Sequence, residues 1–140
     1  MILINNLTTR SINKEILQKI AQVVFKGEGI EEKKEVSLVL VGNARMRNLN
    51  YTHRGKNRTT DVLSFPVKDS VFFANSLGEI IISLKEVSKS AKRLNSNFEK
   101  EFFRCLIHGL LHLLGYNHKK EKERNEMIEK EKNYLLEFFK

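Results

Sequence analysis

Three of the four histidines lie within the eleven-residue segment 108-HGLLHLLGYNH-118. His108 and His112 are four residues apart in a strongly helical stretch, so their imidazoles project from one helix face. Gly115 can take the left-handed conformation that ends a helix and turns the chain, which would bring His118 in from outside the helix. Three neutral imidazoles suit zinc with its fourth position open, as in catalytic sites, although copper, nickel or iron would also accept them. We therefore predict a metal-dependent hydrolase with about one zinc-like ion per chain.

The chain lacks the glutamate that zinc peptidases usually carry next to their first histidine ligand. In H-E-x-x-H metalloproteases the glutamate after the first histidine is the general base. Gly109 occupies that position here, and no Asp or Glu lies between His108 and His118. This disfavours a peptidase or amidase without excluding it. A binding protein whose metal is mainly structural also stays open as an alternative.

Cys105 lies one helical turn before His108 and is the single cysteine of the chain, so it forms no internal disulfide. This is consistent with a reducing cytoplasm. A thiolate from Cys105 would close the metal's open position. We expect instead a small, buried, apolar side chain, which is the commoner role of a lone cysteine.

The net charge of +8 is unevenly distributed along the chain. Five basic residues and no acidic residue fall between positions 45 and 58, namely Arg45, Arg47, Arg54, Lys56 and Arg58. Such a stretch indicates a polyanionic partner, either nucleic acid or an anionic membrane surface. By contrast, 119-KKEKERNEMIEKEK-132 mixes both signs and predicts a solvent-exposed helix face.

The elements that must position these residues can be predicted from hydrophobic periodicity. We expect strands at 2–5, 35–42, 61–67 and 77–83, helices at 13–26, 43–52, 84–94, 98–114 and 120–138, and a basic loop at 53–60. This order predicts an α+β fold with a four-stranded sheet, forming a single catalytic domain over residues 1–140. No apolar run is long enough for a membrane span, and the N-terminus does not resemble a signal peptide.

Three blocks of the sequence resemble the YbeY family of bacterial endoribonucleases. Residues 108–118 are similar to that family's H-G-x-L-H-L-x-G-Y-D-H. Residues 49-LNYTHRGKNRTTDVLSFP-66 resemble its L-N-x-x-Y-R-x-x-x-x-x-T-D-V-L-S-F-P, and 78-GEIIIS-83 resembles its G-D-I-x-I-S. The blocks occur in the family's order. Asn117 and Glu79 replace two aspartates, His53 replaces an aromatic residue, and the loop at 67–76 looks short for the family.

The resemblance implies a metal-dependent endoribonuclease that cuts single-stranded RNA, in 16S ribosomal RNA 3′-end maturation and ribosome quality control. It implies a fold similar to a zinc-metalloprotease catalytic domain, with a mostly mixed four-stranded sheet and about five helices. By motif match, His108, His112 and His118 would bind zinc, His108 would be catalytic as well, and the family's functional arginine falls on Arg54. The implied partners are ribosomal RNA and the small ribosomal subunit in the cytoplasm, with no membrane and no particular protein partner.

The residue types around Arg54 fit this implication. A guanidinium can hold a phosphate through two parallel hydrogen bonds and stabilise charge in a phosphoryl transition state. Lys56 and Arg58 are candidate contacts to the RNA backbone. Thr60, Asp61 and Ser64 flank the start of a strand, where we expect them to cap the backbone. Whether water or the RNA 2′-OH is the nucleophile stays open.

Overall fold

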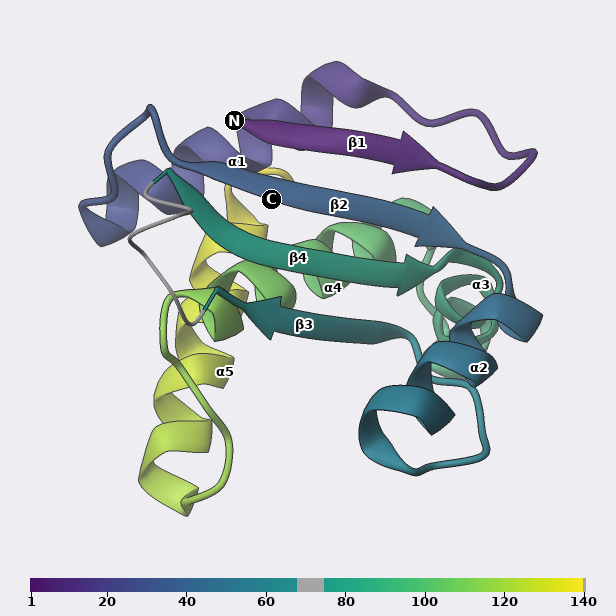
Figure 1. The fold of residues 1–140 in the computed structure, drawn as a ribbon. Helices are drawn as coiled ribbons and strands as arrows, with labels where there is room; N and C mark the ends of the chain where they lie inside the picture. The colour runs from purple at the N-terminus through teal and green to yellow at the C-terminus, as the bar shows by residue number, and fades with distance from the viewer. Residues whose placement is uncertain (68–74, 140) are drawn as a thin grey trace.

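The structure is a computed structural model that describes residues 1–67 and 75–139 (Figure 1). Its elements are β1 (Ile2–Asn6), α1 (Lys14–Glu28), β2 (Glu35–Val41), α2 (Asn43–Arg54), β3 (Val62–Pro66), β4 (Ser76–Ser83), α3 (Leu84–Arg93), α4 (Phe98–Leu113) and α5 (Glu121–Leu136). The predicted order and the α+β class are confirmed, and element ends differ from the predicted ones by one or two residues at most. Most of the loop at 67–76 lies outside the described residues.

The four strands form one mixed sheet in the order β1-β2-β4-β3. Strands β1, β2 and β4 are parallel, and β3 pairs antiparallel with β4. The apolar residues of β2 follow from its central place in the sheet, which helices cover on both sides. Val36, Leu38 and Leu40 lie on one face of β2 and are fully buried, whereas Ser37 and Val39 on the other face are half-buried.

Helices cover the two faces of the sheet unequally. On one face α1 and α4 pack over the large core, in which Leu38, Ile80 and Leu110 are fully buried. On the other face a small cluster of Val41, Met46, Leu63 and Ile81 lies beneath α2. Figure 1 shows that α5 starts beyond β3 and then runs behind the sheet, on the face that α4 covers. No helix in the described part of the chain is long and apolar enough to cross a bilayer.

Helix α4 approaches the sheet very closely at Gly109. A Cβ atom added at this position would lie 2.9 Å from Cγ2 and 3.0 Å from Cδ1 of Ile80. Ile80 is fully buried in β4, and a closely packed interior leaves a side chain little space to shift. Glycine at 109 therefore favours the close packing of the helix that carries His108 and His112.

The prediction of a loop at 53–60 is wrong for the first two residues, 53 and 54. Helix α2 continues through Arg54 and ends at Gly55, which takes the left-handed conformation with φ 69° and donates its N–H to the carbonyl of Tyr51. His53 and Arg54 therefore occupy the last helical turn, where cationic side chains interact favourably with the helix dipole. The His53 ring packs against Phe65 of β3, with ring centroids 4.9 Å apart.

Candidate metal centre and active-site cleft

The structure brings the three histidines of the predicted metal site together. One ring nitrogen from each of His108, His112 and His118 lies within 4.8 Å of the corresponding nitrogens of the other two. The ring centroids are 4.7 Å apart for His108 and His112, 5.0 Å for His112 and His118, and 5.9 Å for His108 and His118. A set of three imidazole donors at this spacing fits a divalent transition metal such as zinc.

The turn after α4 delivers His118. Gly115 has a φ of 102°, which favours glycine. Its N–H donates to the carbonyl of His112, and the N–H of Tyr116 donates to the carbonyl of Leu111. These bonds use carbonyls that the helix end would otherwise leave unpaired. The expected reversal of the chain at Gly115 is confirmed, and it places His118 against the helical pair.

Electrostatics keep His112 neutral. Its burial and the neighbouring rings of His108 and His118 lower its pKa to about 4, and the positive charge of Arg54 contributes in the same direction. The His112 imidazole is thus unprotonated at pH 7, as a metal ligand must be. The effect of Arg54 shows that its charge is felt at the histidine cluster.

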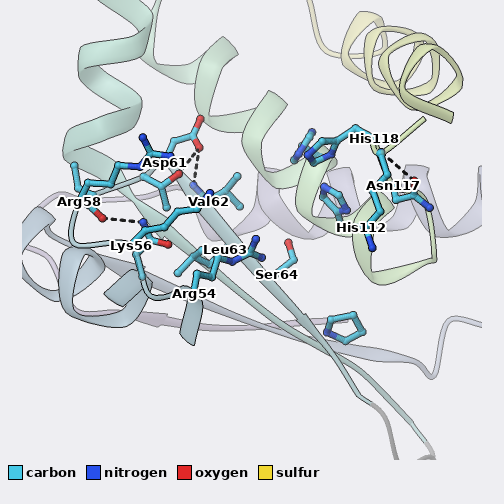
Figure 2. A pocket seen from close by; sticks show the side chains of 16 residues that line it. Arg54, Lys56, Arg58, Asp61, Val62, Leu63, Ser64, His112, Asn117 and His118 are labelled. Carbon is cyan, nitrogen blue, oxygen red and sulfur yellow. Dashed lines mark hydrogen bonds between the residues drawn. The ribbon is translucent and has the colours of Figure 1, made fainter. Parts of the chain in front are cut away.

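A cleft with a volume of about 810 Å³ joins the histidines to the basic segment. Its lining includes Asn50, Arg54, Lys56, Arg58, Thr59, Thr60, Asp61, Val62, Leu63, Ser64, Pro66, His108, His112, Asn117, His118 and Lys119. Figure 2 shows Arg54, Lys56 and Arg58 on one side of the cleft and His112, Asn117 and His118 on the other. Leu63 and Ser64 of β3 lie between the two sides.

The chain matches a known protein family over almost its whole length. The family model for endoribonuclease YbeY matches residues 3–139. Endoribonuclease YbeY of Leptospira interrogans is 38% identical over 132 residues, which cover 81% of this chain and 94% of that protein. Endoribonuclease YbeY of Bacillus cytotoxicus is 36% identical over 134 residues, or 89% of this chain and 83% of that protein. The chain belongs to the YbeY endoribonuclease family.

A solved structure supports the same assignment. The solution structure of a Thermotoga maritima protein matches this fold with a TM-score of 0.71 and 35% identity. The match covers 96% of this chain and 87% of that one. The resemblance inferred from the three sequence blocks is thereby confirmed, together with the α+β fold.

The departures from the YbeY pattern have local explanations. The Asn117 side-chain oxygen accepts the backbone N–H of Lys119, so it caps the turn without bonding to a histidine. Glu79 lies on β4, where its Oε2 is 3.5 Å from the hydroxyl of Ser37 on β2. Asp61 caps the start of β3, as expected, because its Oδ1 accepts the backbone N–H of Val62 at 2.8 Å.

Glu131 is the residue of this site that sequence reasoning missed. It lies on α5, is only 9% exposed, and its Oε2 is 2.8 Å from Nδ1 of His108. The prediction that the Lys- and Glu-rich segment is an exposed face is therefore wrong for Glu131. Burial alone would raise the pKa of Glu131, but its contacts with His108 and Arg104 outweigh burial and lower the pKa below 4.5, so the carboxylate is charged.

A partly buried ionic cluster surrounds Arg104 of α4. Its guanidinium lies 2.6 Å from Glu101, 3.0 Å from Glu131 and 3.5 Å from Asp61. Cys105 is fully buried beside the same cluster, with Sγ 3.7 Å from Oδ2 of Asp61. Burial and the nearby carboxylates raise the pKa of its thiol, which keeps it protonated. Cys105 thus has the buried role expected, apart from the histidine cluster, and Arg104 is the cation of this group.

A second cluster anchors the turn that carries His118. Glu28, at the end of α1, accepts hydrogen bonds from the hydroxyls of Tyr116 and Tyr134 and from the ammonium of Lys130. Burial works to raise the pKa of Glu28, but these bonds prevail and lower it below 4.5. The turn is therefore tied to both α1 and α5, through Tyr116.

Proposed function

We propose that this chain is a metal-dependent endoribonuclease that cuts single-stranded RNA. One observation carries the proposal: three clustered imidazoles and three exposed cations line the same cleft from opposite sides. Among the described residues, no carboxylate pairs with the side chain of Arg54, Lys56 or Arg58. A cleft of this kind suits a chain of phosphates better than a peptide.

Each side of the cleft has its own task. His108, His112 and His118 would hold the ion, for which zinc is the first candidate. When bound, it would supply Lewis-acid polarisation of a phosphate oxygen or activation of the nucleophile. Arg54 would hold the scissile phosphate through its two-pronged guanidinium and balance the negative charge that develops there.

Lys56 and Arg58 would hold the neighbouring phosphates. Both side chains are exposed and border the cleft. Single strands fit best, because the backbone must flex to present one phosphate between the two sides, and a stacked duplex resists this. We further propose ribosomal RNA of the small subunit as substrate, in the cytoplasm, with residues 1–140 acting as one catalytic domain. The name shared by the relatives supports the endoribonuclease activity.

The peptidase alternative lacks a base. A glutamate at 109 would strain the packing, because its Cβ atom would lie 2.9 Å from Cγ2 of Ile80. Asp61 is the carboxylate among the lining residues, and its oxygens are engaged by the Val62 N–H and by Arg104. Peptide hydrolysis at such metals normally uses a carboxylate to move the proton.

The deciding experiment offers two substrates to one preparation. Wild type and His112→Ala are both incubated with zinc. Each protein then receives a labelled RNA hairpin with single-stranded tails and, in a separate reaction, casein. We expect wild type to cut the single-stranded tails, to spare the duplex stem and to leave casein intact. We expect His112→Ala to cut neither the RNA nor casein. Cleavage of casein with intact RNA, lost in His112→Ala, would establish the peptidase instead.

Metal content tests the centre itself. Protein purified without chelators should carry about one transition-metal ion per chain, measured by plasma mass spectrometry. His112→Ala should lose most of it. His53→Ala is the matched control, because His53 packs on Phe65, is not grouped with the three histidines and does not line the cleft, and it should keep the metal. Wild type that neither holds nor takes up a transition metal contradicts the proposal.

A further inference from the structure

The metal ligand His108 has a buried partner on a different helix. Nδ1 of His108 and Oε2 of Glu131 are 2.8 Å apart. A charged carboxylate only accepts hydrogen bonds, so the contact requires the proton of His108 to be on Nδ1. In the neutral imidazole, Nε2 is then left with its lone pair free. His108 lines the cleft and Glu131 does not, so Nε2 is the His108 nitrogen that stays available to a metal in the cleft.

We propose that Glu131 is the positioning residue of the metal centre, which fixes the tautomer and the orientation of His108 through this hydrogen bond. The inference rests on the proposed metal site and adds to it a residue outside the histidine motif. Carboxylates that accept the second N–H of a metal-bound histidine commonly raise metal affinity.

Glu131 is itself held in place. Its second oxygen, Oε1, lies 3.0 Å from Nη1 of Arg104, so each oxygen of the carboxylate has one partner. Arg104 is in turn fixed by Glu101 at 2.6 Å and Asp61 at 3.5 Å. Rotation of the carboxylate away from His108 would therefore break its contacts with two half-buried side chains, those of Arg104 and His108.

The same geometry predicts what a neutral side chain would do. Glutamine at 131 would offer one oxygen and one NH₂ group, whereas its two partners, Arg104 and His108, both donate hydrogen bonds. If its oxygen faces Arg104, its NH₂ donates to Nδ1 of His108 and moves the proton to Nε2, where it blocks the metal. If its oxygen faces His108, the NH₂ group opposes Arg104. Either arrangement weakens the centre without removing a ligand.

The first test measures zinc affinity. Metal-free wild type, Glu131→Gln and Glu129→Gln compete for Zn²⁺ with a chromophoric chelator. Glu129 is the matched control, because it lies on the same helix, is exposed and loses the same charge on substitution. We expect about 10- to 100-fold weaker zinc binding in Glu131→Gln and no change in Glu129→Gln. Equal affinity in all three proteins overturns the inference, while absence of zinc binding in wild type overturns the proposed centre.

The second test reads the tautomer directly and needs no metal. Long-range ¹H–¹⁵N spectra of the zinc-free protein, at a pH where His108 is neutral, report which ring nitrogen carries the proton. We expect the Nδ1–H form in wild type and in Glu129→Gln, and an increased Nε2–H fraction in Glu131→Gln. A purely structural role of Glu131 would leave the tautomer unchanged. An Nε2–H His108 in wild type contradicts the inference even if Glu131→Gln fails to fold.

Discussion

The histidines on one side of the cleft lie on or just after α4, and contacts with other helices hold them. Glu131 contacts His108, and Glu28 accepts a hydrogen bond from Tyr116 in the turn that leads to His118. On the opposite side, Arg54, Lys56 and Arg58 follow one another at the end of α2 and just beyond it. Their side chains are exposed and have no carboxylate partner in the described part of the chain. We call these sides the histidine wall and the basic wall.

The difference between the walls matches two kinds of ligand. An ion accepts little variation in ligand distance or angle, so the histidine wall gains from being fixed before binding. An RNA strand has many backbone conformations, and mobile side chains can follow its phosphates. If RNA binds as proposed, the side chains of the basic wall would lose rotamer freedom on binding, and salt would screen their charges. Changes on each wall should therefore affect different measurements.

The largest effect expected on the basic wall alone is that of Arg54→Ala. If this guanidinium meets the transition state, kcat for RNA cleavage should fall about 100- to 1000-fold, as for loss of a charge-stabilising donor. Zinc content should not change, and stability should stay within about 0.5 kcal/mol, because the side chain is exposed. Single-turnover cleavage and urea unfolding measure the two quantities.

Arg54→Lys sharpens this prediction. Lysine keeps the charge but not the two-pronged geometry, so its activity should lie between wild type and Arg54→Ala. Normal cleavage by Arg54→Ala would show that the basic wall binds RNA without taking part in the reaction.

Gly109→Ala tests whether packing fixes the histidine wall. Alanine is favoured over glycine in helices by about 1 kcal/mol, yet the contact with Ile80 should make the variant about 1–3 kcal/mol less stable. Urea unfolding of metal-free protein checks this. Combining it with Ile80→Ala should cost less than the sum of the two changes, because the second makes room for the first. Unchanged or higher stability of Gly109→Ala would refute the packing explanation.

Loss of two cations tests how the basic wall binds. The double variant Lys56→Ala, Arg58→Ala should reduce the slope of log affinity against log salt by about 1.4 for single-stranded RNA, as for two lost phosphate contacts. Zinc content should be unaffected. Lys14→Ala, Lys19→Ala removes the same charge from α1, which is not part of the cleft lining, and is the control. Equal slopes for both double variants would mean that no particular RNA contacts involve Lys56 and Arg58.

The smallest effect concerns Glu28, which supports the histidine wall from a distance. A carboxylate whose pKa is lowered by folding stabilises the native state above its ordinary pKa of 4.5, and this stability is lost as the pH falls through the lowered value. Glu28→Gln should thus be about 1 kcal/mol less stable at pH 7, with the difference shrinking below pH 4.5. Urea unfolding of metal-free protein across this range is the measurement. A difference independent of pH would mean that the charge of Glu28 contributes nothing.

Local patterns were enough to predict the histidine wall. The four-residue spacing of His108 and His112 and the glycine turn before His118 all lie within eleven residues, and helix geometry converts that spacing into a shared face. The end of α2 was predicted two residues too early, because the polar residues before Gly55 show no periodicity. Strand order could not be predicted, because the placing of β4 between β2 and β3 depends on contacts far apart in the chain.

The burial of Glu131 and its contact with His108 were not predicted from the sequence. It stands in the segment 119–132, in which ten of the fourteen residues are Lys or Glu, and composition alone predicts that all of these are solvated. Position distinguishes it, because Met127, Glu131 and Leu135 recur every four residues and so share one face of α5. A carboxylate on an apolar stripe needs a buried partner. That its partner is His108, 23 residues away, depends on how α5 packs against α4.

The close contact between Gly109 and Ile80 also limits how such a chain can change over generations. Glutamate at 109 would restore the H-E-x-x-H pattern with a single amino-acid replacement, but its Cβ atom would lie 2.9 Å from the Ile80 side chain and weaken the packing. A smaller residue at 80 would have to come first, and Ile→Val or Ile→Ala there costs about 0.5–5 kcal/mol, a large share of the margin that keeps a domain folded. The two positions must therefore change together, or in an order that passes through a weakened protein. The contact between positions 109 and 80 thus works against the glutamate that H-E-x-x-H peptidases use as a base.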